Sequence, residues 1–314
     1  MEHSPSGLNT EHARLMRMAT YASVGVAGVL IAVKLVAWVM TDSMALLSSL
    51  VDSFLDAAAS LINLFAVRQA LQPADRHHRF GHGKAEPLAG LGQAAFISGS
   101  ALFLSIEAVN RLFSPEPVQR GEVGIGVMIF SILVTIALVQ FQRRVAHKTK
   151  SVAIRADSLH YAGDVLINLS VIVSLLLGMF FDLPIADPAF AAGIALYLLY
   201  NAWGILVDSL SLLMDQEFPE EDRQKIRDIA LGVKGARNIH DLRTRSSGPT
   251  GFIQLHLEMD RNITLWEAHA IADRAEAKIR KAFPNTEVII HQDPEGVFEH
   301  HPEHAYADRA EDSA

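Results

Sequence analysis

The sequence contains no cysteine among its 314 residues. This absence excludes disulfide bonds and thiolate metal sites, so any bound metal must be held by imidazole and carboxylate groups. Charged residues are also few, at 20% of the chain, and positive charge is in the minority, with 27 Lys and Arg against 35 Asp and Glu. The resulting net charge of −8 argues against nucleic acid as a partner.

Apolar residues, in contrast, are abundant. Half of the chain is hydrophobic and its mean hydropathy is +0.22. A soluble domain of this length rarely has so apolar an average, so the composition predicts a membrane protein with a soluble portion. We expect no cleavable signal peptide, because the N-terminal stretch "MEHSPSGLNTEHARLMRM" is polar and the apolar stretch after it is long enough to span a bilayer.

Apolar windows of ~20 residues predict six membrane spans. The connections alternate in charge: Lys and Arg gather before the first span, between the second and third, and between the fourth and fifth. The positive-inside rule therefore places both termini in the cytoplasm. The predicted spans are Leu15–Met40, Met44–Ala70, Leu88–Phe113, Val123–Val145, Ala156–Phe181 and Ile185–Met214.

The chain changes character after Met214. Its pattern predicts a helix, two strands joined by a Gly-Pro turn, an amphipathic helix that begins with a Thr264–Glu267 capping box, and a last strand. The sequence thus divides into a polar N-terminal segment (1–13), an all-α six-helix transmembrane bundle (14–214), a cytoplasmic α+β domain of order αββαβ (215–294) and a disordered tail (295–314).

Two carboxylates interrupt the second predicted span, in the stretch "LVDSFLDAAASLIN". Asp52 and Asp56 together cost roughly 5–7 kcal/mol near the bilayer centre. About eleven Leu, Ile, Val and Phe residues of the span return roughly 3–7 kcal/mol. Because the two contributions nearly cancel, the carboxylates must have partners within the bundle.

The fifth span offers such partners in "RADSLHYAGDVLIN", where His160 and Asp164 have the same spacing of four residues. Residues i and i+4 lie on one face of a helix, so two packed faces would present three carboxylates and one imidazole to a common point. Mixed oxygen and nitrogen ligands suit a tetrahedral Zn²⁺ or a similar transition metal better than Mg²⁺. Two alternatives stay open: ion pairs with a buried cation such as Lys34, and a proton relay without metal.

Further histidines lie outside the predicted spans. Asp75, His78 and His82 have spacings of three and four in a glycine-containing connection, which indicates either a second metal site or a solvated basic loop. In the C-terminal region, strand alternation places His256 on one face of its strand, and His291 and Asp293 on one face of another. With His240 on the first strand and His269 on the covering helix, these residues predict a metal cluster, although each histidine alone is typical of a solvated surface.

Several blocks in the same order resemble the cation diffusion facilitators, in particular the bacterial zinc and ferrous-iron efflux pumps of that family. The resemblance extends from Arg14 to Pro294. Arg76 and the tail after Pro294 depart from the family's pattern. The blocks are "LVDSFLD", "LQPADRHHRFGHGKAE", "RADSLHYAGDVLIN", "HDLRTRSSGPTGFIQLHLEM" and "VIIHQDP".

The resemblance implies a homodimer in the bacterial inner membrane whose cytoplasmic domain is metallochaperone-like. It implies Zn²⁺ as transported and regulatory ion, protons as counter-substrate, and a charge interlock between Lys84 and Asp215 that holds the dimer. Asp293 would bridge two ions in the C-terminal cluster. The implied metal sites are Asp52, Asp56, His160 and Asp164 for transport, Asp75, His78 and His82 in the loop, and His240, His256, His269, His291 and Asp293 in the C-terminal domain.

The sequence therefore predicts a secondary transporter and not an enzyme. Metal ligands must be deprotonated, so proton exchange would drive the metal outward with alternating access. Three rival classes of protein fit the sequence less well. A proton-coupled organic-cation carrier would need aromatic residues near the carboxylates, and the two spans offer only Phe54 and Tyr161. A membrane metal sensor gives no reason for charges inside the bilayer, and a hydrolase lacks a pair of nucleophile and base.

Overall fold

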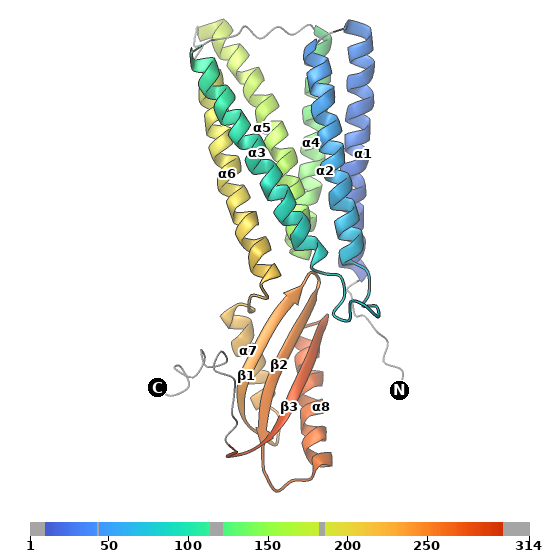
Figure 1. Cartoon of the computed structure of the whole chain (residues 1–314), viewed down its shortest axis with the longest axis vertical. Helices are drawn as coiled ribbons and strands as arrows, with labels where there is room; N and C mark the ends of the chain where they lie inside the picture. The colour runs from blue at the N-terminus through green and yellow to red at the C-terminus, as the bar shows by residue number, and fades with distance from the viewer. Residues whose placement is uncertain (1–9, 43, 114–121, 182–185, 298–314) are drawn as a thin grey trace. The chain divides into compact units, whose positions relative to one another are not determined.

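The computed structural model describes residues 10–42, 44–113, 122–181 and 186–297 (Figure 1). It separates into a helical unit, Thr10–Leu213, and a C-terminal unit that begins at Met214. The helical unit is followed by an α+β fold, so the predicted fold class is confirmed. Most of the predicted N-terminal segment, and the predicted tail from residue 298 onward, lie outside the described residues.

Six long helices form the helical unit, and the shortest has 27 residues. At ~1.5 Å per residue even this helix is ~40 Å long, more than the ~30 Å of a bilayer's hydrocarbon core. Within the described ranges, five of them (all but α5) are also apolar enough to cross a membrane. The helices are α1 (Thr10–Thr41), α2 (Met44–Ala70), α3 (Ala85–Phe113), α4 (Glu122–Thr149), α5 (Val152–Phe181) and α6 (Ala186–Leu213).

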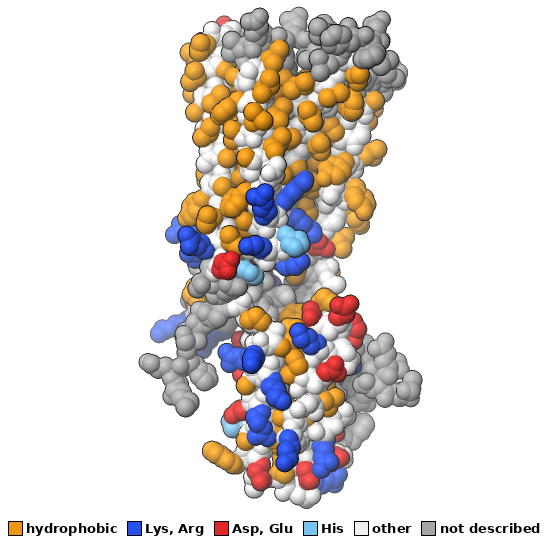
Figure 2. All heavy atoms as spheres, turned by 180° about the vertical axis from the view of Figure 1, so that it is seen from behind, with side chains coloured by type: hydrophobic (Ala, Val, Ile, Leu, Met, Phe, Trp, Pro, Cys, Tyr) orange, Lys and Arg blue, Asp and Glu red, His pale blue; other side chains and the backbone are white. Residues whose placement is uncertain are grey.

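The surface of the helical unit is that of a membrane protein. Large apolar side chains such as Val39 and Phe103, each 71% exposed, point outward. Figure 2 shows hydrophobic side chains along most of this unit, with Lys, Arg and His gathered towards one end of it. Lipid is the solvent that such a surface requires, because the same area in water would drive aggregation.

Helix α5 occupies the centre of the bundle and contacts each of the other five helices. Its residues from Val152 to Gly163 are buried, with Arg155 as the exposed exception. Polar residues in this half of α5 therefore face other helices and not lipid. This arrangement explains why α5 tolerates ionisable residues in the middle of a helical bundle.

The C-terminal unit is a three-stranded sheet of order β1-β2-β3, with β1 antiparallel and β3 parallel to the central strand. Helices α7 and α8 cover one face of the sheet (Figure 1). Buried side chains such as Ile226, Leu255 and Ile279 fill the space between them. The elements are α7 (Glu220–Leu231), β1 (Ala236–Ser247), β2 (Thr250–Met259), α8 (Leu265–Ala282) and β3 (Thr286–Pro294).

The predicted capping box at the start of α8 is confirmed. The Thr264 hydroxyl accepts a hydrogen bond from the Glu267 backbone N–H, and the Glu267 carboxylate accepts one from the Thr264 backbone N–H. This backbone donor lowers the pKa of Glu267, which keeps the cap charged at neutral pH. Helix α1 begins at Thr10, earlier than the predicted span, because its first turns are polar and extend beyond the apolar window.

Candidate metal centres

Asp56, His160 and Asp164 form a cluster inside the helical unit. The His160 Nε2 atom lies 3.0 Å from an oxygen of Asp56 on α2 and 3.9 Å from an oxygen of Asp164 on α5. One ligand atom from each residue lies within 4.8 Å of the others. The packing of α2 against α5 thus brings together two pairs that are far apart in the sequence.

These separations suit a tetrahedral ion. Ligand atoms at ~2.1 Å from a zinc ion lie ~3.4 Å from one another, between the two distances measured here. The imidazole ring is only 7% exposed, so the cluster lies inside the bundle. Phe96 and Tyr161 contact the ring, each with 5.5 Å between ring centroids, and hold its orientation. Tyr161 is held in turn by a 2.8 Å hydrogen bond to Ser60 of α2.

Asp52, the fourth residue of the predicted site, lies outside this three-residue group. Its side chain is exposed, one turn along α2 from Asp56. Lys34 of α1 is nearby: its ammonium donates to the Ser53 hydroxyl at 2.7 Å and interacts electrostatically with Asp52, Asp56 and Asp164. The structure therefore gathers three of the predicted ligands and adds a cation beside them.

Asp75, His78 and His82 form a second cluster in the loop between α2 and α3. The Asp75 oxygens lie 3.4 Å from Nδ1 of His78 and 3.3 Å from Nε2 of His82. The same carboxylate accepts the backbone N–H groups of His77 and His78, which lowers the pKa of Asp75. Gly81, with φ of +80°, lets the loop turn back so that His82 reaches Asp75.

The third cluster lies on the sheet and follows from its register. His240, His256 and His291 are direct neighbours across the three strands. Two residues further along β2 and β3, Glu258 pairs with Asp293 in the same register. Because side chains alternate along a strand, a row of imidazoles lies beside a row of carboxylates on one face of the sheet.

Asp293 is the hub of this cluster. One of its oxygens lies 2.8 Å from Nδ1 of His256 and 3.5 Å from Nε2 of His240, and the other lies 3.1 Å from Nε2 of His291. Its side chain is only 5% exposed beneath the three rings. This arrangement suits a carboxylate that bridges two ions.

His269 and Glu258 differ from the prediction in opposite ways. His269 lies outside the cluster of described ligand atoms and pairs instead with Asp273, one turn along α8, at 3.5 Å. Glu258 was not among the predicted ligands, yet it lies 3.2 Å from Nδ1 of His240. Strand alternation, which places Glu258 on the same face as His256, is the sequence signal that could have found it.

The two residues of the predicted charge interlock belong to different units. Lys84 donates to the carbonyl oxygen of Leu213 at 3.1 Å, at the end of α6. Asp215 lies 3.4 Å from the guanidinium of Arg245 in the C-terminal unit. The interlock between subunits stays a prediction.

Sequence reasoning also missed Asp157, which is 1% exposed on α5. It precedes His160 by three residues and therefore lies on the same helix face. This spacing is the sequence feature that could have pointed to Asp157. Its hydrogen-bond partners could not be found in this way, because they come from three other helices.

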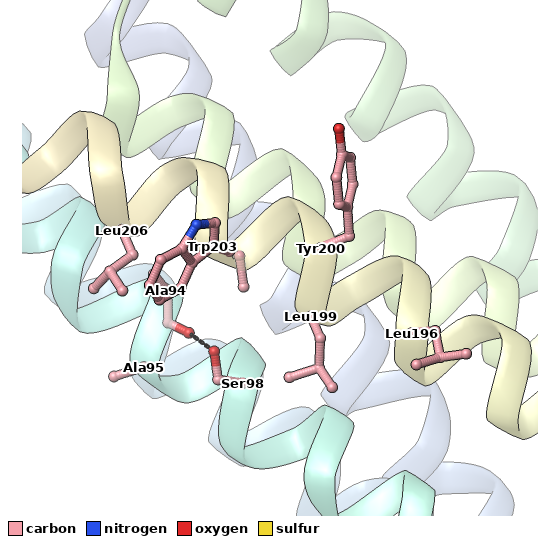
Figure 3. Close-up of a pocket in the computed structure, with 9 residues that line it drawn as sticks. Ala94, Ala95, Ser98, Leu196, Leu199, Tyr200, Trp203 and Leu206 are labelled. Carbon is pink, nitrogen blue, oxygen red and sulfur yellow. Dashed lines mark hydrogen bonds between the residues drawn. The ribbon is translucent and has the colours of Figure 1, made fainter.

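An apolar cavity of about 580 Å³ lies between α3 and α6 (Figure 3). Its wall includes Leu199, Trp203 and Leu206, and the Ser98 hydroxyl at its edge donates to the Ala94 carbonyl. None of the described residues that line it is a carboxylate or an imidazole. The cavity is therefore unsuited to a metal ion.

Comparison with known proteins identifies the family. The cation efflux transmembrane domain matches residues 20–214, and the cytoplasmic domain of cation efflux proteins matches residues 218–295. The chain belongs to the cation diffusion facilitator family and is a transporter, not an enzyme. It moves metal cations across a membrane through a multi-pass helical domain.

Among curated relatives, the chain is similar to cation-efflux pumps named FieF. It is 48% identical to FieF of Klebsiella pneumoniae over 92% of this chain and 96% of the relative. It is also 48% identical to FieF of Cronobacter sakazakii over 93% of this chain and 100% of the relative. A solved structure of the putative zinc transporter CzrB in its zinc form is 32% identical and covers 27% of this chain and 99% of its own, with a TM-score of 0.25.

Proposed function

We propose that this protein exports Zn²⁺, and also Fe²⁺ or Cd²⁺, across the bacterial inner membrane in exchange for protons. The observation that carries the proposal is the cluster of Asp56, His160 and Asp164, which places two carboxylates and one imidazole inside a membrane helix bundle. Asp52, one turn away on α2, would swing in as the fourth ligand. The donor set favours a transition metal over a hard ion such as Mg²⁺.

Proton exchange follows from the chemistry of the ligands. A metal ion binds only to the unprotonated imidazole and to ionised carboxylates, so binding releases protons and protonation expels the metal. With both termini in the cytoplasm and alternating access of the bundle, an inward proton gradient becomes an outward metal flux. The positive side chains at the ends of α2 and α4, such as Arg68 and Lys148, support this orientation.

The other two clusters take supporting roles in this proposal. The loop cluster of Asp75, His78 and His82 captures cytoplasmic metal beside the bundle. The C-terminal cluster around Asp293, with His269 as a further ligand, senses excess metal and stabilises a homodimer that Lys84 and Asp215 hold together. Metal bound there would shift the population of conformations and would not itself be carried.

Uptake of radioactive zinc into inside-out vesicles tests the transport function. Zinc should accumulate when the vesicle interior is acidic, and an ionophore that dissipates the proton gradient should stop the accumulation. Asp56→Asn should abolish uptake, whereas Asp228→Asn, an exposed change on α7, should leave it intact. Zinc uptake that is unchanged both without the proton gradient and in Asp56→Asn would contradict the proposal.

A further inference from the structure

Asp157 is a buried carboxylate that the described transport site does not use. One of its oxygens accepts hydrogen bonds from the Ser23 hydroxyl and the Gln142 amide, both at 2.6 Å. The other oxygen accepts a bond of 3.2 Å from the Gln93 amide. The three donors come from α1, α4 and α3, so four helices meet at this carboxylate.

Among the described residues, the hydrogen-bond donors that contact Asp157 are all uncharged. Within the described residues, no lysine or arginine forms an ion pair with Asp157, and burial of a carboxylate is costly without such a pair. The outer oxygens of Gln93 and Gln142 are also buried, and neither has a hydrogen-bond partner in the described part of the chain. A buried acceptor without a donor calls for a ligand. In the structure the N–H groups of both amides face Asp157, so a reversal of the two amides would surround one negative charge with acceptor oxygens, which is the environment of a cation.

The position of Asp157 relates this cluster to the transport site. Asp157, His160 and Asp164 follow one another along a single face of α5. Asp157 lies ~4.5 Å along the helix axis from His160, towards the end that carries Lys150 and Arg155. A cation that moves from this end along the ligand-bearing face meets Asp157 before it meets His160.

We propose that Asp157 forms a second cation position on the transport path, on the cytoplasmic side of Asp56, His160 and Asp164. The ligands are the Asp157 carboxylate, the Ser23 hydroxyl and the amide oxygens of Gln93 and Gln142. The two amides turn over when the ion arrives, so that each presents its oxygen in place of its N–H group. This inference rests on the proposed transport function.

The ligand set explains why this position holds the ion only briefly. All four ligands are oxygen atoms and only one is charged, whereas the transport site adds an imidazole and a second carboxylate. Transition metals such as Zn²⁺ bind more tightly where imidazole is present. The ion therefore passes from the weaker position to the stronger one. After it leaves, the amide N–H groups of Gln93 and Gln142 again donate hydrogen bonds to the Asp157 carboxylate.

Asp157→Asn separates the charge of this residue from its packing, because Asn has the same size and its oxygen still accepts hydrogen bonds. For zinc uptake from the cytoplasmic face of inside-out vesicles, the variant should lower kcat/KM at least about tenfold. Its equilibrium zinc affinity at the transport site should stay within about twofold of the wild type. Asp208→Asn on α6, an exposed carboxylate bonded to Arg155, is the matched control and should keep normal uptake. Unchanged kcat/KM in Asp157→Asn would overturn the inference.

A second experiment keeps Asp157 and uses the absence of cysteine. Ser23→Cys places a single thiol beside the carboxylate, and a thiolate holds Cd²⁺ far more tightly than a hydroxyl does. Brief exposure to Cd²⁺ should then block zinc uptake, and the block should persist after free Cd²⁺ is removed. Ser23→Ala should show no lasting block, and Ser23→Cys combined with Asp157→Asn should recover from it.

Lasting sensitivity of Ser23→Cys to Cd²⁺ shows that the metal visits this position. If Ser23→Cys were no more sensitive than the wild type, the ion would not pass Asp157 and the inference would be wrong. Failure of the transport function is a separate result, because the wild-type protein would then show no proton-driven zinc uptake at all. If the wild-type protein shows normal uptake, Asp56→Asn abolishes it and Asp157→Asn preserves it, the inference about Asp157 is wrong and the proposed transport function stands.

Discussion

The cluster in the helical unit and the cluster on the sheet use the same chemical groups in two different frameworks. In the bundle, one turn of α5 separates His160 from Asp164, and only the packing of α2 brings Asp56 to 3.0 Å from the ring. On the sheet, the hydrogen-bonded register alone aligns His240, His256 and His291. The first cluster depends on how helices pack, and the second depends on a ladder of backbone bonds.

This difference determines what each site can do. Helices that slide or tilt can separate Asp56 from His160 without breaking a backbone hydrogen bond, so the site in the bundle can open and close. Strands cannot shift without breaking their ladder, so the site on the sheet keeps its geometry. Under the proposed function, the contrast teaches that the same kinds of ligand would release an ion when they stand on helices and retain one when they stand on a sheet.

The largest effect on zinc uptake is expected from a substitution that removes a carboxylate from the bundle. Asp164→Asn should lower proton-driven zinc uptake at least about a hundredfold, because one of the charges that balance the divalent ion is lost where no solvent can replace it. Uptake of radioactive zinc into inside-out vesicles is the measurement. Asp208→Asn, an exposed change on α6, serves as the control and should retain uptake.

The next effect concerns the hub of the sheet. Asp293→Asn should weaken zinc binding by the C-terminal cluster about thirtyfold, because one carboxylate contacts all three imidazoles. Glu258→Gln, which alters a contact to His240 alone, should weaken it only about threefold. Isothermal titration calorimetry in an Asp164→Asn background measures both. Equal effects of the two variants would show that Asp293 does not bridge.

A smaller effect concerns Lys34, the cation beside the site in the bundle. Lys34→Met should tighten zinc binding at the transport site about tenfold, because the Lys34 ammonium repels a divalent ion near the three carboxylates. Calorimetry in an Asp293→Asn background isolates this site, and Lys148→Met at the end of α4 is the control. Weaker binding in Lys34→Met would mean that the ammonium organises the carboxylates and does not compete with the metal.

The smallest effect concerns the loop cluster and its pH dependence. The pKa of Asp75 is lowered by backbone N–H groups, so its carboxylate stays ionised as the pH falls from about 8 to about 5.5. Asp75→Asn should weaken zinc binding by the same factor, about threefold, at about pH 8 and at about pH 5.5, because the carboxylate that it removes is ionised at both. A pH series of zinc titrations is the measurement, and a loss of affinity that disappears towards the lower pH would contradict this assignment.

Local sequence patterns predicted much of this fold. Apolar windows marked the long helices to within a few residues, and the Thr264–Glu267 pattern marked the start of α8. The same logic of spacing predicted that His160 and Asp164 would share a helix face and that His291 and Asp293 would share a strand face. These successes share a cause, because each depends on the repeat of a helix or of a strand.

Contacts set by tertiary packing escaped prediction. The partners of Asp157 lie 134, 64 and 15 residues away in the sequence and on three different helices. Spacing could not show that the Asp52 side chain stays exposed, since a shared helix face does not determine side-chain direction. His269 on the covering helix was predicted to join the metal cluster, but its partner in the structure is Asp273 on its own helix.

The ordered imidazole rings around Asp293 have one further consequence, which concerns the entropy of metal binding. Contacts within the protein hold the rings of His240 and His256 with their centroids 5.0 Å apart, and those of His256 and His291 4.6 Å apart. Ligands ordered in this way lose little conformational entropy when they close on an ion. An ion that binds between these rings would therefore meet ligands that are already in place, and the C-terminal unit would not have to refold around it.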